Sequence, residues 1–135
     1  MFRKAALIGC LLAVITIQPS AQEPLPPKVK PVAVEPKHDT KEQRKANKKL
    51  AKAIAGAGFG WTGKEWKCLD YILYNESKYD RKADNKHSTA YGLAQMLGED
   101  SKDATIQLLH GYKYIVTRYD TPCKAVHFHH RHRYY

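Results

Sequence analysis

The sequence contains no apolar run long enough to cross a membrane comfortably. Its longest run, residues 5–17, is shorter than the roughly 20 residues that a transmembrane helix needs. Arg3 and Lys4 precede this run and small residues follow it, which is the pattern of an export signal. We therefore expect residues 1–21 to form a signal peptide and the cleaved chain to be secreted or periplasmic, without stable membrane insertion.

Two features of this region leave other outcomes open. Pro19 is unfavourable so close before a cut after Ala21, so a retained anchor is one alternative. Residues 7–10 end in Cys10 and have the form of a lipoprotein box, but few apolar residues precede them. Ordinary cleavage remains the expectation.

Cysteine is also scarce, with three residues in the whole chain. Cys10 leaves with the signal peptide, so Cys68 and Cys123 remain as an even pair in an oxidising compartment. These two residues can either form one disulfide or remain as two unpaired, buried thiols.

Acidic residues are fewer than basic residues. The chain has 13 aspartates and glutamates and 23 lysines and arginines, which gives a net charge of +10. Residues 22–55 hold nine basic and four acidic residues, a net +5, whereas residues 56–135 hold twelve and nine, a net +3. Such a basic segment is attracted to anionic walls, nucleic acid or lipid, although a lysine-rich face can also serve solubility alone. The export signal argues against nucleic acid as the partner.

Proline is nearly absent from the C-terminal hundred or so residues and is concentrated in residues 22–39. Since proline fixes φ and removes a backbone donor, this segment is predicted to be an extended linker. One small folded domain is expected over residues 40–135.

Two stretches of this domain have the apolar periodicity of amphipathic helices. The first covers residues 39–57, where Thr40 and Gln43 can form a capping box, and glycines within 56–63 are expected to end it. The other covers residues 105–119 and places four apolar side chains on one face: Leu108, Tyr112, Ile115 and Tyr119.

A further helix, predicted for residues 62–76, carries the residue around which the domain is organised. Thr62 and Glu65 have the spacing of a capping box at its start. At about 100° per residue, one face collects Trp66, Leu69, Ile72, Leu73 and Glu76. The apolar stripe thus ends in a carboxyl group, and burial raises the pKa of a carboxyl toward the range of a general acid. The alternative is that Glu76 turns out to solvent at the helix end.

A series of residues beginning at the end of this helix follows a known pattern. It consists of Glu76-Ser77, Tyr79, Ala83, Asn85, Ser88, Ala90-Tyr91-Gly92-Leu93 and Gln95, then Gln107, Gly111, Tyr114-Ile115, Arg118-Tyr119, Pro122-Cys123, Ala125 and Tyr134-Tyr135. The series resembles the lysozyme-like soluble lytic transglycosylases, in the short form of secreted bacterial and phage proteins. The resemblance implies a mainly α, single lysozyme-like helical domain behind the signal peptide and linker.

By this resemblance, Glu76 is the catalytic acid of an enzyme that cleaves peptidoglycan glycan strands in the cell wall, between N-acetylmuramic acid and N-acetylglucosamine. The positions that correspond to lining residues of the sugar groove are Ser88, Tyr91, Gln95 and Tyr114. For Tyr91, packing in the core is the alternative. The resemblance also implies that Cys68 and Cys123 pair.

This family uses one carboxyl group, whereas hydrolysing glycosidases usually use two. The reaction implied by the resemblance closes an anhydro ring on the sugar and consumes no water. Asp80 and Asp84 are the nearest candidates for a second carboxylate, and both are expected to be solvated at the surface. A lysozyme-type hydrolase, and a non-catalytic wall-binding or virion structural protein on the same fold, are the alternatives.

Gly92 allows a close approach of its backbone to a ligand or a neighbouring helix.

The C-terminal segment contains His127, His129, His130 and His132, but no acidic or cysteine partner recurs at a defined spacing. A basic terminal element packed through its tyrosines is therefore expected rather than a zinc site, and we expect a monomer without cofactor or metal.

Overall fold

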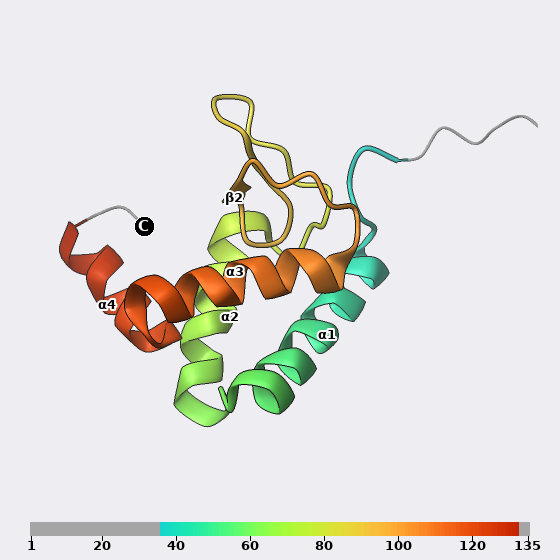
Figure 1. Ribbon diagram of the computed structural model, residues 1–135. Coiled ribbons are helices and arrows are strands. Elements are labelled where there is room, and N and C mark those ends of the chain that lie inside the picture. Colours follow the sequence, from blue (N-terminus) through green and yellow to red (C-terminus); the bar gives the residue numbers. More distant parts are fainter. Residues whose placement is uncertain (1–35, 133–135) are drawn as a thin grey trace, which may run out of the picture. The chain divides into compact units, whose positions relative to one another are not determined.

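The computed structural model describes residues 36–132, which form four helices and one short antiparallel hairpin (Figure 1). In chain order they are α1 (Lys41–Phe59), α2 (Gly63–Ser77), β1 (Ala90–Tyr91), β2 (Met96–Leu97), α3 (Ala104–Tyr119) and α4 (Pro122–His132). This is the mainly α architecture that the sequence predicted. The predicted signal peptide, residues 22–35 of the predicted linker, and Tyr134-Tyr135 lie outside the described residues. Within 36–132, no helix is long and apolar enough to span a membrane.

α1 begins at the predicted capping box, two residues after the predicted start, and ends two residues later than predicted. The Thr40 hydroxyl accepts a hydrogen bond from the Gln43 backbone N–H at 3.2 Å, and the Gln43 side chain accepts one from the Thr40 N–H at 2.7 Å. The helix continues to Phe59, and Gly60 ends it in the left-handed conformation, with φ +67°. The glycine-containing segment 56–63 therefore ends the helix as predicted. The predicted end at residue 57 is two residues early, because Phe59 stacks on Trp61 and holds the last turn against the core.

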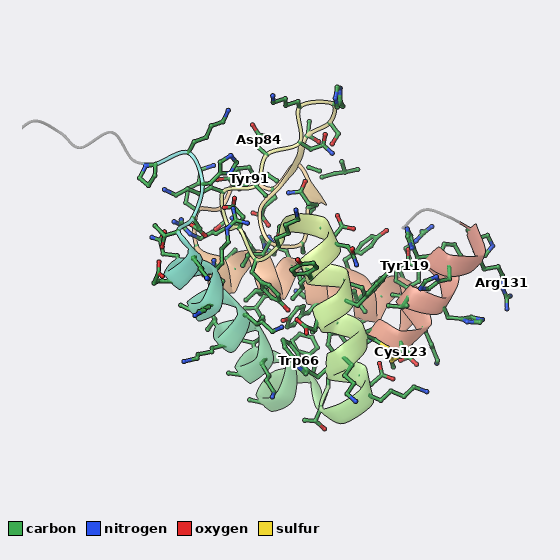
Figure 2. All side chains as sticks on the ribbon, turned by 180° about the vertical axis from the view of Figure 1, so that it is seen from behind. Trp66, Asp84, Tyr91, Tyr119, Cys123 and Arg131 are labelled. Carbon is green, nitrogen blue, oxygen red and sulfur yellow. A yellow bond between two sulfur atoms is a disulfide. The ribbon has the colours of Figure 1, made fainter. Side chains whose placement is uncertain are left out.

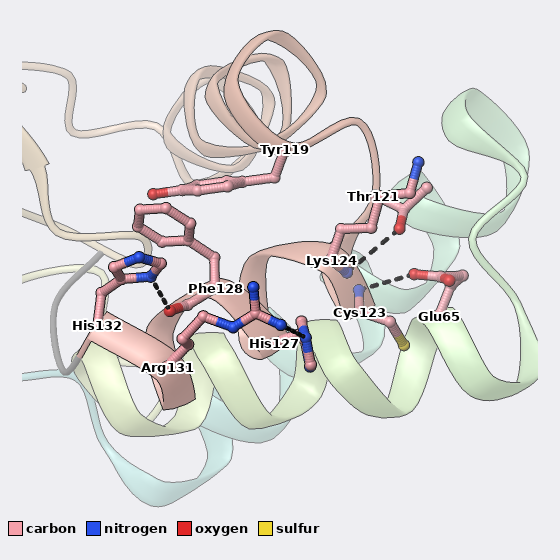
Figure 3. Close-up of a pocket in the computed structure, with 9 residues that line it drawn as sticks. All are labelled: Glu65, Tyr119, Thr121, Cys123, Lys124, His127, Phe128, Arg131 and His132. Atoms are coloured by element: carbon pink, nitrogen blue, oxygen red, sulfur yellow. Dashed lines mark hydrogen bonds between the residues drawn. The ribbon is translucent and has the colours of Figure 1, made fainter.

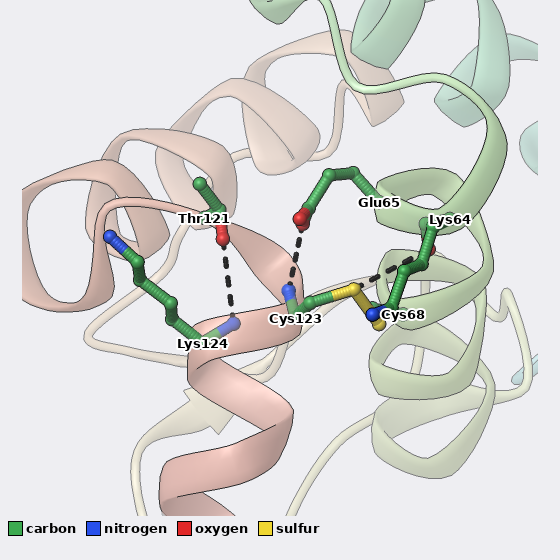
Figure 4. The surroundings of a disulfide bond; sticks show 6 residues. All are labelled: Lys64, Glu65, Cys68, Thr121, Cys123 and Lys124. Carbon is green, nitrogen blue, oxygen red and sulfur yellow. Dashed lines mark hydrogen bonds between the residues drawn. A yellow bond between two sulfur atoms is a disulfide. The ribbon is translucent and has the colours of Figure 1, made fainter.

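The predicted capping box at the start of α2 is also wrong. Thr62 is the N-cap residue, but its side chain makes no capping hydrogen bond. Glu65 Oε2 instead accepts a hydrogen bond from the backbone N–H of Cys123, at 2.9 Å (Figure 4). The carboxylate thus serves the first turn of α4, where unpaired backbone N–H groups and the helix dipole favour an anion.

The Cys68–Cys123 disulfide lies beside this contact and joins α2 to α4 (Figure 4). It is the pairing that the resemblance implied. The helix that it holds was not predicted as a helix from the sequence. Pro122 is the residue that indicates it, because proline is favoured at the first position of a helix, where its missing N–H costs nothing.

The predicted apolar faces of α2 and α3 contribute to one core, together with side chains of α1 and α4 that pack against both helices. The α2 side chains expected there are buried: Trp66, Leu69, Ile72 and Leu73. So are the four expected on α3: Leu108, Tyr112, Ile115 and Tyr119. The hydroxyl of the fully buried Tyr112 donates a hydrogen bond to the Ala51 carbonyl at 2.9 Å, which ties α3 to α1.

The irregular segment between α2 and α3 is held by one buried amide. The Gln107 side chain accepts a hydrogen bond from the Leu93 N–H at 3.0 Å and donates to the carbonyls of Arg81 and Ser101 at 3.1 and 2.7 Å. Gly92, with φ +81°, passes so close that a Cβ atom there would lie 2.5 Å from this amide. The close approach expected at Gly92 is therefore an approach to a neighbouring helix.

Asp80 is buried, so its predicted place at the solvated surface is wrong. Its residue is 2% exposed. Its carboxylate lies 2.8 Å from both the Arg44 guanidinium and the His38 ring nitrogen, and it accepts hydrogen bonds from the N–H groups of Asp39 and Lys82. Burial alone would raise the pKa of Asp80, but these partners together hold its pKa below the ordinary value.

A second buried carboxylate completes this network. Asp39, which the predicted boundary assigns to the linker, accepts hydrogen bonds from the Asn47 side chain and the Arg81 N–H, both at 2.9 Å. The chain just ahead of α1 is thereby fastened to the loop that follows α2. Asp84, by contrast, is exposed as expected.

Replacing Asp80 by Asn is expected to lower the free energy of unfolding by about 2 kcal/mol near pH 7, because Arg44 loses its counter-ion and one acceptor becomes a donor. Since the folded-state pKa of Asp80 is lowered, its stabilisation is present above the ordinary value of 3.8 and is lost as pH falls through the folded-state value. Urea unfolding at neutral and strongly acidic pH measures both effects. An equal loss in the matched Asp84→Asn variant would contradict the assignment.

Candidate functional site

Glu76 lies in the last turn of α2 and lines a cavity of about 330 Å³ formed by α2, α3, α4 and the β2 hairpin. Most of the lining is apolar: Ile72, Leu73, Ala94, Met96, Leu97, Gly111, Ile115 and Ala125. The other lining residues are Glu76, Gln95, Tyr112, Tyr114 and Tyr119. A concave apolar surface with a few polar groups is typical of a site for a small organic ligand.

Glu76 is the only carboxyl group that lines this cavity among the residues that the structure describes. No lysine, arginine or histidine lines it, and no hydrogen bond or ion pair of the Glu76 side chain is present within residues 36–132. Burial therefore raises the pKa of Glu76 above its ordinary value of 4.5. A larger fraction of this carboxyl is protonated near neutral pH than at the surface, as a general acid requires.

Gln95 shares the cavity with Glu76 in a constrained conformation. It is one of few non-glycine residues with positive φ, at +48°. Its amide nitrogen donates to the carbonyls of Ala83 and Gly92 at 3.1 and 3.0 Å. Because both amide hydrogens are used, the carbonyl oxygen is the part of this side chain left to bind a donor from a ligand. A left-handed non-glycine residue is a feature that often accompanies a functional site.

Tyr114, predicted as a substrate residue, lies on the same cavity and is 38% exposed. Its ring packs edge-on against Tyr119, with centroids 6.0 Å apart. Burial and then the Tyr119 hydroxyl raise the pKa of Tyr114, so its hydroxyl stays protonated and can donate a hydrogen bond.

The other two predicted groove residues do not line the Glu76 cavity. The Ser88 hydroxyl is exposed and accepts a hydrogen bond from the Ala90 N–H at 3.2 Å. Tyr91 is half-buried on β1, with the Lys102 ammonium 3.9 Å from its ring centroid. Figure 2 shows Tyr91 and Asp84 among the loops, well apart from Tyr119, Cys123 and Arg131. Of the four predicted lining residues, the structure brings Gln95 and Tyr114 together with Glu76.

Ser77 fixes the end of α2 against the loop that carries Gln95. Its hydroxyl donates a hydrogen bond to the Leu93 carbonyl at 2.8 Å. Sequence reasoning noted Ser77 only as part of a Glu-Ser pair. It also missed Leu97, which is 74% exposed at the cavity, and Ala125, which reaches it from α4. No sequence pattern marks these two, since their place depends on how the hairpin and α4 pack.

A second cavity of about 530 Å³ runs along α4 and shares Tyr119 with the first (Figure 3). Arg131 projects into it and lies 3.0 Å from the His127 ring nitrogen. Within residues 36–132, no group of three or more histidine, cysteine, aspartate or glutamate side chains is arranged to hold a metal ion.

Comparison of the chain with models of protein families, with curated proteins and with solved structures finds no match. The arrangement of the site therefore carries the functional argument. It consists of a disulfide-linked, mainly helical domain with one partly buried carboxyl group in an apolar cavity.

Proposed function

We propose that this protein is a peptidoglycan lytic transglycosylase with a lysozyme-like fold, and that Glu76 is its catalytic acid and base. The observation that carries the proposal is the single partly buried carboxyl group in a cavity that also contains Gln95 and Tyr114. The three residues coincide with positions of the resemblance. Their chemistry suits a sugar, because an amide oxygen and a phenol can bond hydroxyl and acetamido groups while the apolar lining covers the ring.

The proposed reaction has two steps. Protonated Glu76 gives its proton to the glycosidic oxygen, and the bond between that oxygen and the anomeric carbon of N-acetylmuramic acid breaks. The acetamido group of the substrate carries the developing positive charge. Glu76, now a carboxylate, removes the proton of the sugar's own primary hydroxyl, whose oxygen bonds to the anomeric carbon. The result is an anhydro ring, and the enzyme returns to its protonated state without consuming water.

The available carboxylates favour this reaction over hydrolysis. A hydrolysing glycosidase of the usual kind holds two carboxyl groups about 5–10 Å apart. Asp80 is engaged by Arg44 and His38, and neither it nor Asp84 lines the Glu76 cavity. Glu76 therefore acts alone in the proposal, on glycan strands as the only partner and without a cofactor.

Mass spectrometry of the sugar fragments released from purified peptidoglycan tests the proposal. A transglycosylase releases fragments that are lighter by one water than hydrolytic products and that lack a reducing end. Fragments with a reducing end would instead support a lysozyme-type hydrolase. If the wild-type protein releases no fragments, the result would support a non-catalytic wall-binding protein.

A further inference from the structure

A row of four lysines, Lys41, Lys45, Lys49 and Lys52, follows the exposed side of α1, and we call it the lysine row. At about 100° and 1.5 Å per residue, these positions fall within an arc of about 80° and extend over about 16 Å. All four side chains are exposed, and none has an acidic partner within residues 36–132.

The charge of the lysine row is not neutralised by its own helix. Glu42 is the single acidic residue of α1. Lys48 lies next to the row but differs from it, because its ammonium group pairs with Asp70 on α2 at 2.7 Å. The opposite face of α1 is buried through Asn47, Ala51 and Ala55. Like charges one turn apart destabilise a helix slightly, so a bound anion would relieve a repulsion that the free helix retains.

We propose that the lysine row binds a linear polymer of phosphate groups that carries no bases. Lysine binds phosphate as a point charge, and a row of such charges lacks the planar fork by which arginine recognises carboxylate and phosphate groups in a bidentate manner. Arg44, the single arginine of α1, is directed to Asp80 and does not belong to the row.

The composition of the exposed side of α1 separates this partner from two others. Its uncharged exposed residues are small or polar: Gln43, Ala46, Ala53, Ala57 and Gly58. A helix that docks on a membrane inserts large apolar or aromatic side chains into the lipid. A surface that tracks single-stranded nucleic acid stacks the bases on aromatic rings. Neither kind of side chain is exposed on α1.

The lysine row is independent of the proposed catalytic reaction. α1 contributes no residue to the Glu76 cavity within the described chain, and it packs against α2 and α3 rather than α4. Figure 1 shows α1 and α4 on opposite sides of α2. Binding at the lysine row can therefore succeed or fail whatever the outcome for Glu76.

The test replaces all four lysines of the row by glutamine in the full chain. A matched control replaces four exposed lysines that are scattered over α2, the loop and α3: Lys64, Lys67, Lys86 and Lys113. Both variants lose the same charge, and glutamine keeps helix propensity. Affinity for inorganic polyphosphate is measured as a function of sodium chloride, with circular dichroism as the check on folding.

We expect the slope of log affinity against log salt to fall by about three in the row variant, at about 0.7 per phosphate contact, and by less than one in the control. Equal losses in both variants would overturn the proposal in favour of net charge alone, and so would no loss in either. If the row variant does not fold, the Lys45→Gln/Lys52→Gln double variant is expected to show half the effect.

Two further probes separate the alternatives. Vesicles of phosphatidylglycerol and phosphatidylcholine test a membrane, and single-stranded DNA tests a base-bearing polymer. Row-dependent binding to vesicles without row-dependent binding to polyphosphate would overturn the proposal. Much tighter binding of DNA than of polyphosphate at equal salt would do the same, because it would show that bases contribute.

Discussion

Replacing Glu76 by Gln is expected to reduce the lysis of purified cell walls about a thousandfold, the contribution of a well-placed acid-base group. Glutamine keeps the shape and polarity of the side chain but cannot give a proton to the glycosidic oxygen. The measurement is the rate of turbidity loss of a peptidoglycan suspension together with the yield of anhydro fragments. The Asp84→Asn variant is the matched control, because Asp84 is an exposed carboxylate that does not line the Glu76 cavity.

The same substitution is expected to leave stability unchanged or to raise it slightly. The folded-state pKa of Glu76 lies above its ordinary value of 4.5, so the ionised form is disfavoured in the folded protein. Folding stability contributed by this group is therefore present at low pH and is lost as pH rises through the folded-state value. A neutral glutamine side chain would carry no such penalty, and thermal unfolding near pH 7 checks this sign.

The pH profile gives an independent check on the role of Glu76. A general acid acts in its protonated form, so kcat/KM is expected to fall as pH rises through the raised pKa of Glu76. Wall lysis by the Glu76→Gln variant at the wild-type rate would remove the proposed mechanism. A loss of lysis in Asp84→Asn of similar size would indicate a second carboxylate and hence a hydrolase.

Replacing Cys68 and Cys123 together by serine is expected to lower the free energy of unfolding by about 4 kcal/mol. The bond closes a loop with a sequence separation of 55 residues, and loss of that constraint enlarges the entropy of the unfolded chain by this amount as an upper figure. The domain is small, so the loss is a large fraction of a typical total stability. Urea unfolding of both proteins, with and without a reducing agent, measures it.

Loss of the disulfide is also expected to loosen the part of the Glu76 cavity wall that α4 forms, because Ala125 of α4 lines this cavity. The matched control is the reducing agent itself, which is expected to destabilise the wild type and to leave the serine variant unchanged. Equal stability of the two proteins under oxidising conditions would contradict a stabilising role for the bond. The substitution leaves the backbone N–H at position 123 in place, so its hydrogen bond to Glu65 is expected to keep part of the contact between α2 and α4.

Periodicity predicted α1, α2 and α3 and the buried faces of α2 and α3, because each of these features depends on residues close together in the chain. The Thr40 capping box and the buried stripe from Trp66 to Leu73 are examples. The partial burial of Glu76 follows from the same pattern, since it occupies the position where the stripe would continue. Only the resemblance predicted that Gln95 and Tyr114 would lie in one groove with Glu76.

The features that the sequence did not predict depend on partners distant in the chain. The spacing of Thr62 and Glu65 predicted a capping box, which does not form. The Glu65 carboxylate instead accepts a hydrogen bond from a backbone N–H at the start of α4. Asp80 is in a polar stretch that is typical of a surface loop, yet Arg44 and His38 approach it from about forty residues away. Ser88 and Tyr91 depart from the expected groove because the pairing of β1 with β2 sets their positions.

The amide of Gln107 limits where this chain can change its length. This amide is hydrogen-bonded to the backbone of Arg81, Leu93 and Ser101, which act as three anchors of the segment. An insertion near any of these residues would therefore disturb all three hydrogen bonds. Residues 84–89 are all exposed and lie between two of the anchors. The ends of this segment hold the hairpin, because Asp84 pairs with Tyr91, Asn85 bonds to Ala90 and Thr89 bonds to Gly98. Extra residues are therefore expected to be tolerated best at 86–88, where the domain could carry an inserted peptide or tag.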